Sequence, residues 1–254
     1  DDQTNPATVP TIYSKLLDVD KVDLVLGGYG TNMVVPAIPV AIQKKKTMIG
    51  LFAADANHKF KYPGYFAMIP IGQNVSSFTE GFFQIAAAQS PKPETLAIAM
   101  ADAEFAHNVC GGARENAKKH GLKIVYDKSY PPATQDFTPI VRAVQATNPD
   151  LFLVCSYPVD SVGMVRAVRE VDFKPRMWGG AMVGLQATAI KTQLKEKLNG
   201  IVNYETWVPS MIYEGTTEFF KTYQARAGAE GVDPLGYYLG GWGYAYIQVL
   251  GQAI

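Results

Sequence analysis

Short apolar runs alternate along this chain with longer segments whose apolar residues recur at helical spacing. The apolar runs predict β-strands at residues 22–26, 47–52, 65–71, 95–100, 122–126, 151–155, 176–178 and 201–207. The segments between and around them predict helices at residues 6–17, 34–45, 76–89, 104–120, 137–147, 160–171, 185–198, 214–228 and 236–254. Strands that alternate with helices of this length predict an α/β fold, with parallel sheets flanked by helices.

The segment VDLVLGGYGTNM, residues 22–33, predicts an anion site. Its strand ends at Gly27 and Gly28, and Thr31 or Asn32 is placed to cap the helix that follows. Backbone N–H groups at a helix start, together with the helix dipole, attract a negative group, here a carboxylate. The alternative, that the glycines only form a turn, stays open. No Gly-Lys-Ser/Thr ending is present, so a phosphate loop is not predicted.

The loops after other strands point to binding rather than to catalysis. Small or aromatic residues follow four predicted strands, at 27–31, 52–55, 156–157 and 179–182. Open parallel sheets bind ligands at the carboxyl ends of their strands. None of these loops collects a nucleophile, a base and an orienting group, so we predict that the chain is not an enzyme. Asp102, Glu104 and His107 form the alternative catalytic cluster, although acids at that point also suit a helix start.

Composition narrows the class of protein. The chain has 23 basic and 23 acidic residues and 48% hydrophobic residues, which predicts a globular protein without a nucleic-acid partner. The spacing of His58, His107 and His120 does not suit a metal site, so no metal is predicted. Cys110 and Cys155 are predicted to be two buried free thiols, with a disulfide as the alternative.

Several segments together resemble the solute-binding proteins of ABC importers for branched-chain amino acids and related solutes, which have the type I periplasmic binding fold. These segments are DDQTNPATV, VDLVLGGYGTNMVVPAIPVA, ETLAIAMADAEFAHNV, KSYPPATQDFTPIVRAVQATNPDLFLVCSYP and GWGYAYIQVLGQAI. Their order covers nearly the whole chain. The resemblance implies two lobes joined by hinge segments, one near residues 67–71 and another near 203–209, with the ligand held between the lobes.

Carried onto this sequence, the resemblance places residues 1–68 and 208–254 in lobe one and residues 69–207 in lobe two. Members of the family have a strand, a helix and a strand before the DDQ segment and a strand-bearing tail after the last helix. Neither is present in these 254 residues, so we expect a fragment whose first lobe is incomplete.

The resemblance also implies which residues bind the ligand. The loop with Tyr29, Thr31 and Asn32 and the amides of the 52–54 loop would take a carboxylate, and the other positions would close over it. The full implied set is Tyr29, Thr31, Asn32, Phe52, Ala53, Ala54, Phe105, Tyr157, Ala181 and Tyr238. The aromatic members suit a flat ring, although aromatic residues at strand ends are also common in cores.

Amino-acid-binding members of the family place an acid where this sequence has Ala181, to pair with the ammonium group of the ligand. Residues 179–186 contain no acid, and an unpaired buried ammonium is costly. Asp55 and Asp102 remain as substitutes. The predicted ligand is therefore a small organic acid without an α-amino group, with an aromatic carboxylate favoured and an amino acid or amide as the alternative.

The remaining expectations follow from the resemblance. It implies a periplasmic monomer that needs no cofactor, closes around its ligand by a hinge motion and delivers it to an ABC permease. A ligand-sensing regulator of the same fold, an enzyme and a purely structural module are the other functions that the sequence leaves open.

Overall fold

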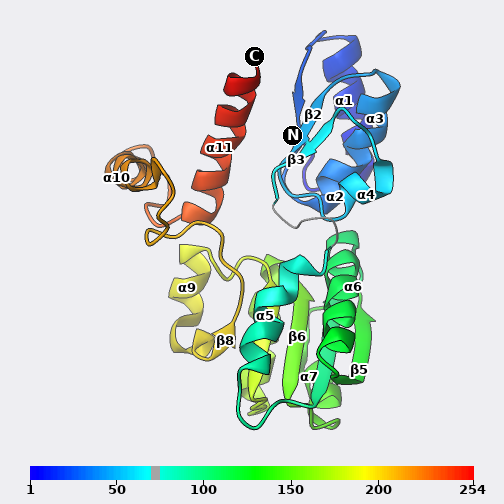
Figure 1. Ribbon diagram of the computed structural model, residues 1–254, viewed down its shortest axis with the longest axis vertical. Helices are drawn as coiled ribbons and strands as arrows, with labels where there is room; N and C mark the ends of the chain where they lie inside the picture. Colours follow the sequence, from blue (N-terminus) through cyan, green and yellow to red (C-terminus); the bar gives the residue numbers. More distant parts are fainter. Residues whose placement is uncertain (70–74) are drawn as a thin grey trace. The chain divides into compact units, whose positions relative to one another are not determined.

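The computed structural model describes residues 1–69 and 75–254 (Figure 1). The chain separates into two compact units. The first unit holds Asp1–Phe78 and Ala103–Gly112, and the second holds Thr79–Asp102 and Ala113–Ile254. Residues 208–254 thus lie in the second unit, and the predicted lobe boundaries stay a prediction. The predicted strand and hinge ending at residue 71 fall partly on residues 70–74, outside the described residues.

The first unit is built on a parallel sheet of order β1-β2-β3. Its strands are β1 (Val25–Leu26), β2 (Met48–Gly50) and β3 (Tyr65–Ala67). Its helical elements are η1 (Pro6–Thr8), α1 (Val9–Asp18), α2 (Thr31–Val34), η2 (Val35–Ala37), α3 (Ile38–Gln43) and α4 (Ala56–Phe60). Residues of α1, α2, α3 and β2 share one buried core that includes Leu17, Val34, Ile38 and Met48.

The single helix predicted after β1 is divided into α2, η2 and α3 in the structure. Pro36 and Pro39 each lie in the first two positions of a new helical piece. Proline has no N–H to continue an i→i−4 ladder, which explains the division. At the opening of the chain, the side chain of Asn5 accepts from the Ala7 amide, so Asn5 rather than Thr4 caps the first turn.

The second unit is built on a parallel sheet of order β5-β4-β6-β7-β8. Its strands are β4 (Thr95–Ala101), β5 (Lys123–Tyr130), β6 (Leu151–Ser156), β7 (Met177–Met182) and β8 (Ile201–Val202). Every residue of β6 and β7 is buried, which accounts for their continuous apolar runs, because parallel strands are covered on both faces. The predicted α/β class and the parallel pairing are confirmed.

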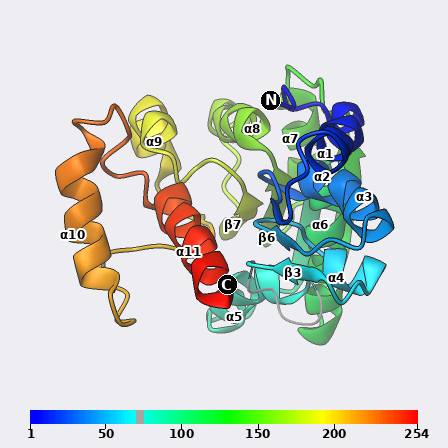
Figure 2. The ribbon, with the colours of Figure 1, turned by 90° about the horizontal axis from the view of Figure 1, so that it is seen from above.

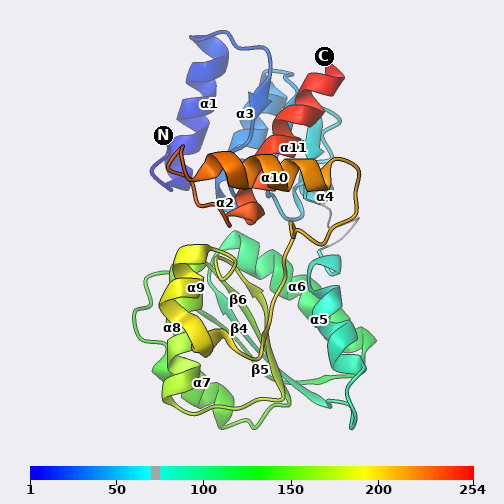
Figure 3. The ribbon, with the colours of Figure 1, turned by 90° about the vertical axis from the view of Figure 1, so that its left-hand side faces the viewer.

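Helices cover both faces of this sheet. Figures 2 and 3 show α5 and the C-terminal half of α6 on one face and α7 and α8 on the other. The helical elements are α5 (Ser77–Ala87), α6 (Glu104–Lys119), α7 (Thr138–Gln145), α8 (Pro158–Glu170), α9 (Thr188–Leu194), η3 (Lys195–Leu198), α10 (Thr216–Ala227) and α11 (Tyr237–Ala253). Helix α6 belongs to both units, because the first unit ends at Gly112 and the second resumes at Ala113.

The prediction of two free thiols is wrong. Cys110 and Cys155 are both disulfide-bonded, and both are fully buried. Their separation along the sequence gave no measure of their separation in space. In the structure Cys155 lies opposite Met100 in the β4–β6 pair, and Cys110 lies in the helix that follows β4.

Candidate functional site

Two loops at the carboxyl end of the first sheet contact each other through predicted site residues. One follows β1 and carries Tyr29 and Thr31, and the other follows β2 and carries Phe52 and Ala54. The Thr31 hydroxyl oxygen accepts a hydrogen bond of 3.0 Å from the Ala54 amide. The rings of Tyr29 and Phe52 lie edge to face, with centroids 5.1 Å apart. The parallel pairing of β1 and β2 brings these loops together.

The Thr31 hydroxyl does not cap α2, although the sequence predicts Thr31 or Asn32 as the capping residue. Gly30 is the N-cap of α2, with a φ of 87° that favours glycine, and Thr31 is the first helical residue. The Thr31 side chain, only 1% exposed, turns to Ala54 instead of back to its own helix. The Ala54 amide therefore donates to a protein group, whereas the family resemblance implies that it binds a ligand carboxylate. Asn32, half-buried, occupies the second position of α2.

The second loop is fixed at its far end by an unusual backbone conformation. Ala53 and Ala54 are 1% and 2% exposed, so their methyl groups point into the unit. Asp55, which follows, has a φ of 62° and forms the N-cap of α4. A left-handed conformation is uncommon for a residue other than glycine, although Asp tolerates it better than most. The small side chains leave the backbone of this corner close to the neighbouring loop.

Helix α6 brings a third group of side chains to the first unit. Phe105 lies in its first turn, half-buried, with its ring edge to face against Phe78 at 5.6 Å. One turn later the Asn108 amide group donates to the Ala54 carbonyl oxygen at 3.2 Å. Glu104, a member of the alternative catalytic cluster, forms an ion pair of 2.9 Å with Lys59. Seven of the ten predicted site residues thus lie in the first unit.

The other three predicted residues lie in the second unit. Tyr157 directly follows β6, is half-buried and is the N-cap of α8. Ala181 is fully buried and pairs with Cys155 inside the sheet. Tyr238 lies at the start of α11 and is half-buried.

The strand that contains Ala181 is longer than predicted. The sequence predicts a loop from Gly179 onward, but β7 continues to Met182. Both strand glycines have positive φ, 126° at Gly179 and 93° at Gly180. A Cβ on Gly179 would lie 2.3 Å from the Val202 carbonyl oxygen, so glycine allows β8 to approach β7 closely. The segment that leaves this strand therefore begins at Val183, and residues 183–186 contain no acid.

Three residues that the sequence analysis missed hold the segment after β8. The Asn203 side chain accepts from the Met182 amide at 3.0 Å and donates to the Met182 carbonyl at 2.8 Å, as a strand neighbour would. Gln186 donates to the Tyr204 carbonyl at 3.0 Å. The hydroxyl oxygens of Tyr204 and Tyr238 lie 3.4 Å apart. Single polar residues after a short strand carry no pattern from which these contacts could be predicted.

A buried polar cluster lies where β5 and β6 end. Asp160 is 5% exposed, and its burial raises the pKa of its carboxyl group, while a hydrogen bond from the Tyr157 backbone acts in the opposite direction. Burial, with Asp160 nearby, also raises the pKa of the Tyr130 hydroxyl. Beside them Ser161 donates to the Val183 carbonyl at 2.7 Å and contacts the Ser156 hydroxyl at 2.8 Å. This cluster fixes the start of α8 and with it Tyr157.

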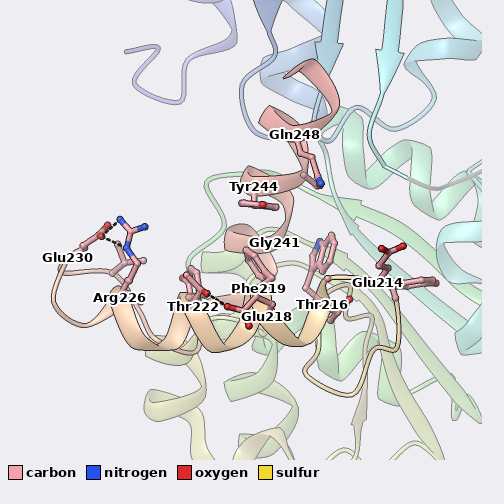
Figure 4. A pocket seen from close by; sticks show the side chains of 17 residues that line it. Glu214, Thr216, Glu218, Phe219, Thr222, Arg226, Glu230, Gly241, Tyr244 and Gln248 are labelled. Carbon is pink, nitrogen blue, oxygen red and sulfur yellow. Dashed lines mark hydrogen bonds and ion pairs between the residues drawn. The ribbon is translucent and has the colours of Figure 1, made fainter. Parts of the chain in front are cut away.

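A separate pocket of ≈ 610 Å³ lies against α10 and α11 (Figure 4). Its walls combine aromatic residues, among them Trp207, Phe219 and Tyr244, with polar and acidic ones. Its one arginine, Arg226, forms an ion pair of 2.7 Å with Glu230, and the lining also holds Glu214 and Glu218. None of the ten predicted site residues lines this pocket. It offers a carboxylate much less than the Thr31–Ala54 region does.

Within residues 1–69 and 75–254, no group of three His, Cys, Asp or Glu side chains is placed to hold a metal ion. None of the helices in the same residues has the length and apolar character required to span a bilayer.

A family model described as "Periplasmic binding protein" matches residues 1–254. The chain belongs to this family. Among curated members, it is 28% identical over 147 residues to "Leu/Ile/Val-binding protein homolog 8" of Brucella abortus (strain 2308). That match covers 56% of this chain and 36% of the relative, so the chain spans little more than a third of the relative's length.

Solved structures of the family share the fold. A leucine binding protein from Thermotoga maritima superposes with a TM-score of 0.85 at 15% identity, over 98% of this chain and 69% of that one. An ABC transporter solute binding protein from R. palustris in complex with 4-hydroxybenzoate has a TM-score of 0.78 at 19% identity. That match covers 97% of this chain and 65% of the other. A solute binding protein from Rhodopseudomonas palustris BisB5 in complex with 3,4-dihydroxy benzoic acid has a TM-score of 0.74 at 18% identity. That match covers 97% of this chain and 66% of the other. The predicted type I periplasmic binding fold is confirmed.

Proposed function

We propose that this chain is the substrate-binding component of an ABC importer and that its ligand is a small organic acid, with an aromatic carboxylate favoured. The observation that carries the proposal is the contact between the loops after β1 and β2, where the Thr31 hydroxyl meets the Ala54 amide at 3.0 Å beside the Tyr29–Phe52 ring pair. This region combines the hydroxyl, the start of α2 and two rings, which suit a carboxylate attached to a flat ring.

The lack of an acid near Ala181 favours an acid ligand without an α-amino group. Residues 179–186 hold no carboxylate, and Ala181 is fully buried. A buried ammonium without a partner costs several kcal/mol. A cost of this size is enough to turn micromolar binding into negligible binding. The hydroxybenzoate complexes of structural neighbours support this choice. The names of the leucine-binding neighbour and the Leu/Ile/Val-binding relative make leucine the competing ligand.

The free energies of the separate interactions indicate how much binding energy the site has to supply. Burying an aromatic ring contributes about 2–3 kcal/mol. Micromolar affinity needs about 8 kcal/mol net, after several kcal/mol of association cost. Hydrogen bonds to a charged carboxylate contribute about 1.5–3 kcal/mol each, so three or four of them close the difference. The carboxylate, rather than the ring, is therefore the part of the ligand on which binding depends.

The proposed location is the periplasm, and the proposed partner is a membrane permease. Cys110 and Cys155 are both disulfide-bonded, which is typical of proteins in oxidising compartments and supports this location. Closure of a second lobe over the acid stays a prediction, as do the monomeric state and the absence of a nucleic-acid partner.

Calorimetric titration of the purified chain tests the ligand class. The panel contains 4-hydroxybenzoate, 3,4-dihydroxybenzoate, phenylpyruvate and L-leucine, with 4-hydroxybenzyl alcohol as the matched compound without a carboxylate. We expect at least one aromatic acid to bind more tightly than leucine and the alcohol to bind more than a hundredfold more weakly than 4-hydroxybenzoate, because about 3 kcal/mol is lost with the charged group. Preference for leucine would overturn the ligand class, and no binding at all would overturn the proposed function.

A further inference from the structure

We infer that Asn108 is a positioning residue for the bound acid and that it acts through the Ala54 peptide. The inference rests on the proposed function, because it assumes that the loop after β2 contacts the ligand. Its basis is the hydrogen bond of 3.2 Å from the Asn108 side-chain nitrogen to the Ala54 carbonyl oxygen. Both residues belong to the first unit, although Asn108 comes from α6, 54 residues further along the chain.

Ala54 is held on both sides of its Cα atom. Its N–H donates to the Thr31 hydroxyl, and its C=O accepts from Asn108. Ala54 is 2% exposed, so water is not positioned to replace either partner readily. The next residue, Asp55, has the left-handed φ of 62°. Such a conformation persists when surrounding bonds determine it, and these two bonds lie immediately before it.

The Thr31 hydroxyl gains a defined role from this arrangement. It accepts the Ala54 N–H at 3.0 Å, and a hydroxyl that accepts with its oxygen still has its own proton to donate. With Ala54 fixed, the oxygen of Thr31 is held on the side of the Ala54 amide, and the proton remains for a carboxylate. When Ala54 moves, the direction of this donor is no longer set. Asn108 therefore affects the ligand without contacting it.

Glu104 strengthens the same contact only weakly. It precedes Asn108 by four residues, which places both on one face of α6. It pairs with Lys59, on α4 just after the Ala54 corner, at 2.9 Å. The two side chains are 34% and 53% exposed, and ion pairs with this much exposure contribute little to stability. The effect on the acid is thus assigned mainly to Asn108.

The chain contains a matched control for Asn108. Asn116 lies on the same helix, is 4% exposed and donates to the Thr79 hydroxyl at 3.2 Å, in the second unit. Asn116→Ala also removes a hydrogen bond from a side-chain amide, one that is more deeply buried than that of Asn108 and does not reach the Ala54 corner. Asn108→Asp keeps the shape of Asn108, but places an acceptor where the donor was.

The experiment combines two measurements on the full chain. Amide hydrogen exchange without ligand reports the order of residues 53–57, and titration with 4-hydroxybenzoate reports affinity. We expect Asn108→Ala and Asn108→Asp to speed exchange in residues 53–57. Both should also raise the dissociation constant about tenfold, because one partly buried hydrogen bond is lost. Asn116→Ala should change neither, and Glu104→Gln should raise the dissociation constant less than about threefold, as expected for an exposed pair.

The outcomes separate the inference from the proposed function. Unchanged exchange in the two Asn108 variants, or an Asn108→Asp variant that binds 4-hydroxybenzoate as tightly as the unmutated chain, overturns the inference. An equal loss of affinity in Asn116→Ala also overturns it, because the effect would then be one of general stability. If the unmutated chain binds none of the panel compounds, the proposed function fails and the binding role of Asn108 fails with it, whereas the exchange data still decide whether Asn108 orders the corner.

Discussion

The hydroxyl oxygen of Thr31 accepts the backbone N–H of Ala54 at 3.0 Å, across 23 residues of sequence. Both residues are almost fully buried, and each lies in the loop that follows a strand of the same parallel sheet. This bond joins the two loops on which the proposed carboxylate site depends. Its removal should therefore change both the stability of the first unit and the affinity for an acid.

Thr31→Val should lower the free energy of unfolding by about 1–3 kcal/mol, because it leaves the buried Ala54 amide without its acceptor. It should also raise the dissociation constant for 4-hydroxybenzoate at least tenfold, because the hydroxyl donor is lost. Chemical denaturation and calorimetry measure the two effects. Thr79→Val is the control, since Thr79 is equally buried and bonded to Asn116 in the second unit. Unchanged affinity in Thr31→Val would remove Thr31 from the site.

The sequence was sufficient to predict this neighbourhood but not its bonds. Apolar runs separated by helical segments predict parallel strands, and parallel pairing places the loops with Thr31 and Ala54 at one sheet edge. That the Ala54 amide donates to Thr31, rather than to a ligand, depends on ångström-scale positions that no pattern encodes. The contact from Asn108 is harder still to predict, because it depends on where α6 lies relative to a loop 54 residues earlier.

Glycines caused the clearest error in the predicted boundaries. Gly179 and Gly180 predict the end of a strand, because glycine is normally unfavourable within strands. In the structure they continue β7, since only a residue without a side chain permits the approach of Val202. Periodicity describes which face is buried and contains no information on how closely a neighbouring strand approaches.

Gly179→Ala should destabilise the second unit by about 3 kcal/mol or more. The added Cβ would meet the Val202 carbonyl oxygen at 2.3 Å, and the φ of 126° is strained for any residue with a side chain. Gly243→Ala is the control, because it lies within α11 with no atom near its added Cβ, and it should stabilise by about 0.5–1 kcal/mol. Urea denaturation of both variants measures the contrast. Equal stabilities would contradict the close approach of β8 to β7.

The disulfide bonding of Cys110 and Cys155 should contribute about 2–4 kcal/mol to stability. Since about 1 kcal/mol corresponds to roughly 2–4 °C for a chain of this size, a reductant should lower the thermal midpoint by about 10 °C. Differential scanning calorimetry with and without the reductant measures this shift, and a thiol count verifies the reduction. The Cys110→Ala/Cys155→Ala double variant should be insensitive to reductant. A fully reduced chain that melts at the oxidised midpoint would contradict the prediction.

Asp160 should make the chain less stable as the pH rises. Its burial raises the pKa of the folded carboxyl group above the value in the unfolded chain. Between those two pKa values the folded state binds more protons than the unfolded state, so the free energy of unfolding falls as the pH rises through this window. Below the unfolded pKa both states are protonated and the penalty is absent.

Asp160→Asn should remove that dependence, because an amide stays neutral and its oxygen is still able to accept from the Tyr157 backbone. The variant should therefore gain stability relative to the unmutated chain at pH 7, and this gain should shrink as the pH is lowered through the folded pKa toward 4. Thermal midpoints of both proteins across this range provide the measurement, with Asp172→Asn as the exposed control, since Asp172 is 75% exposed beside Lys174. A gain that stays constant across the pH range would show that Asp160 is charged in the folded chain at every pH tested, against the effect of its burial.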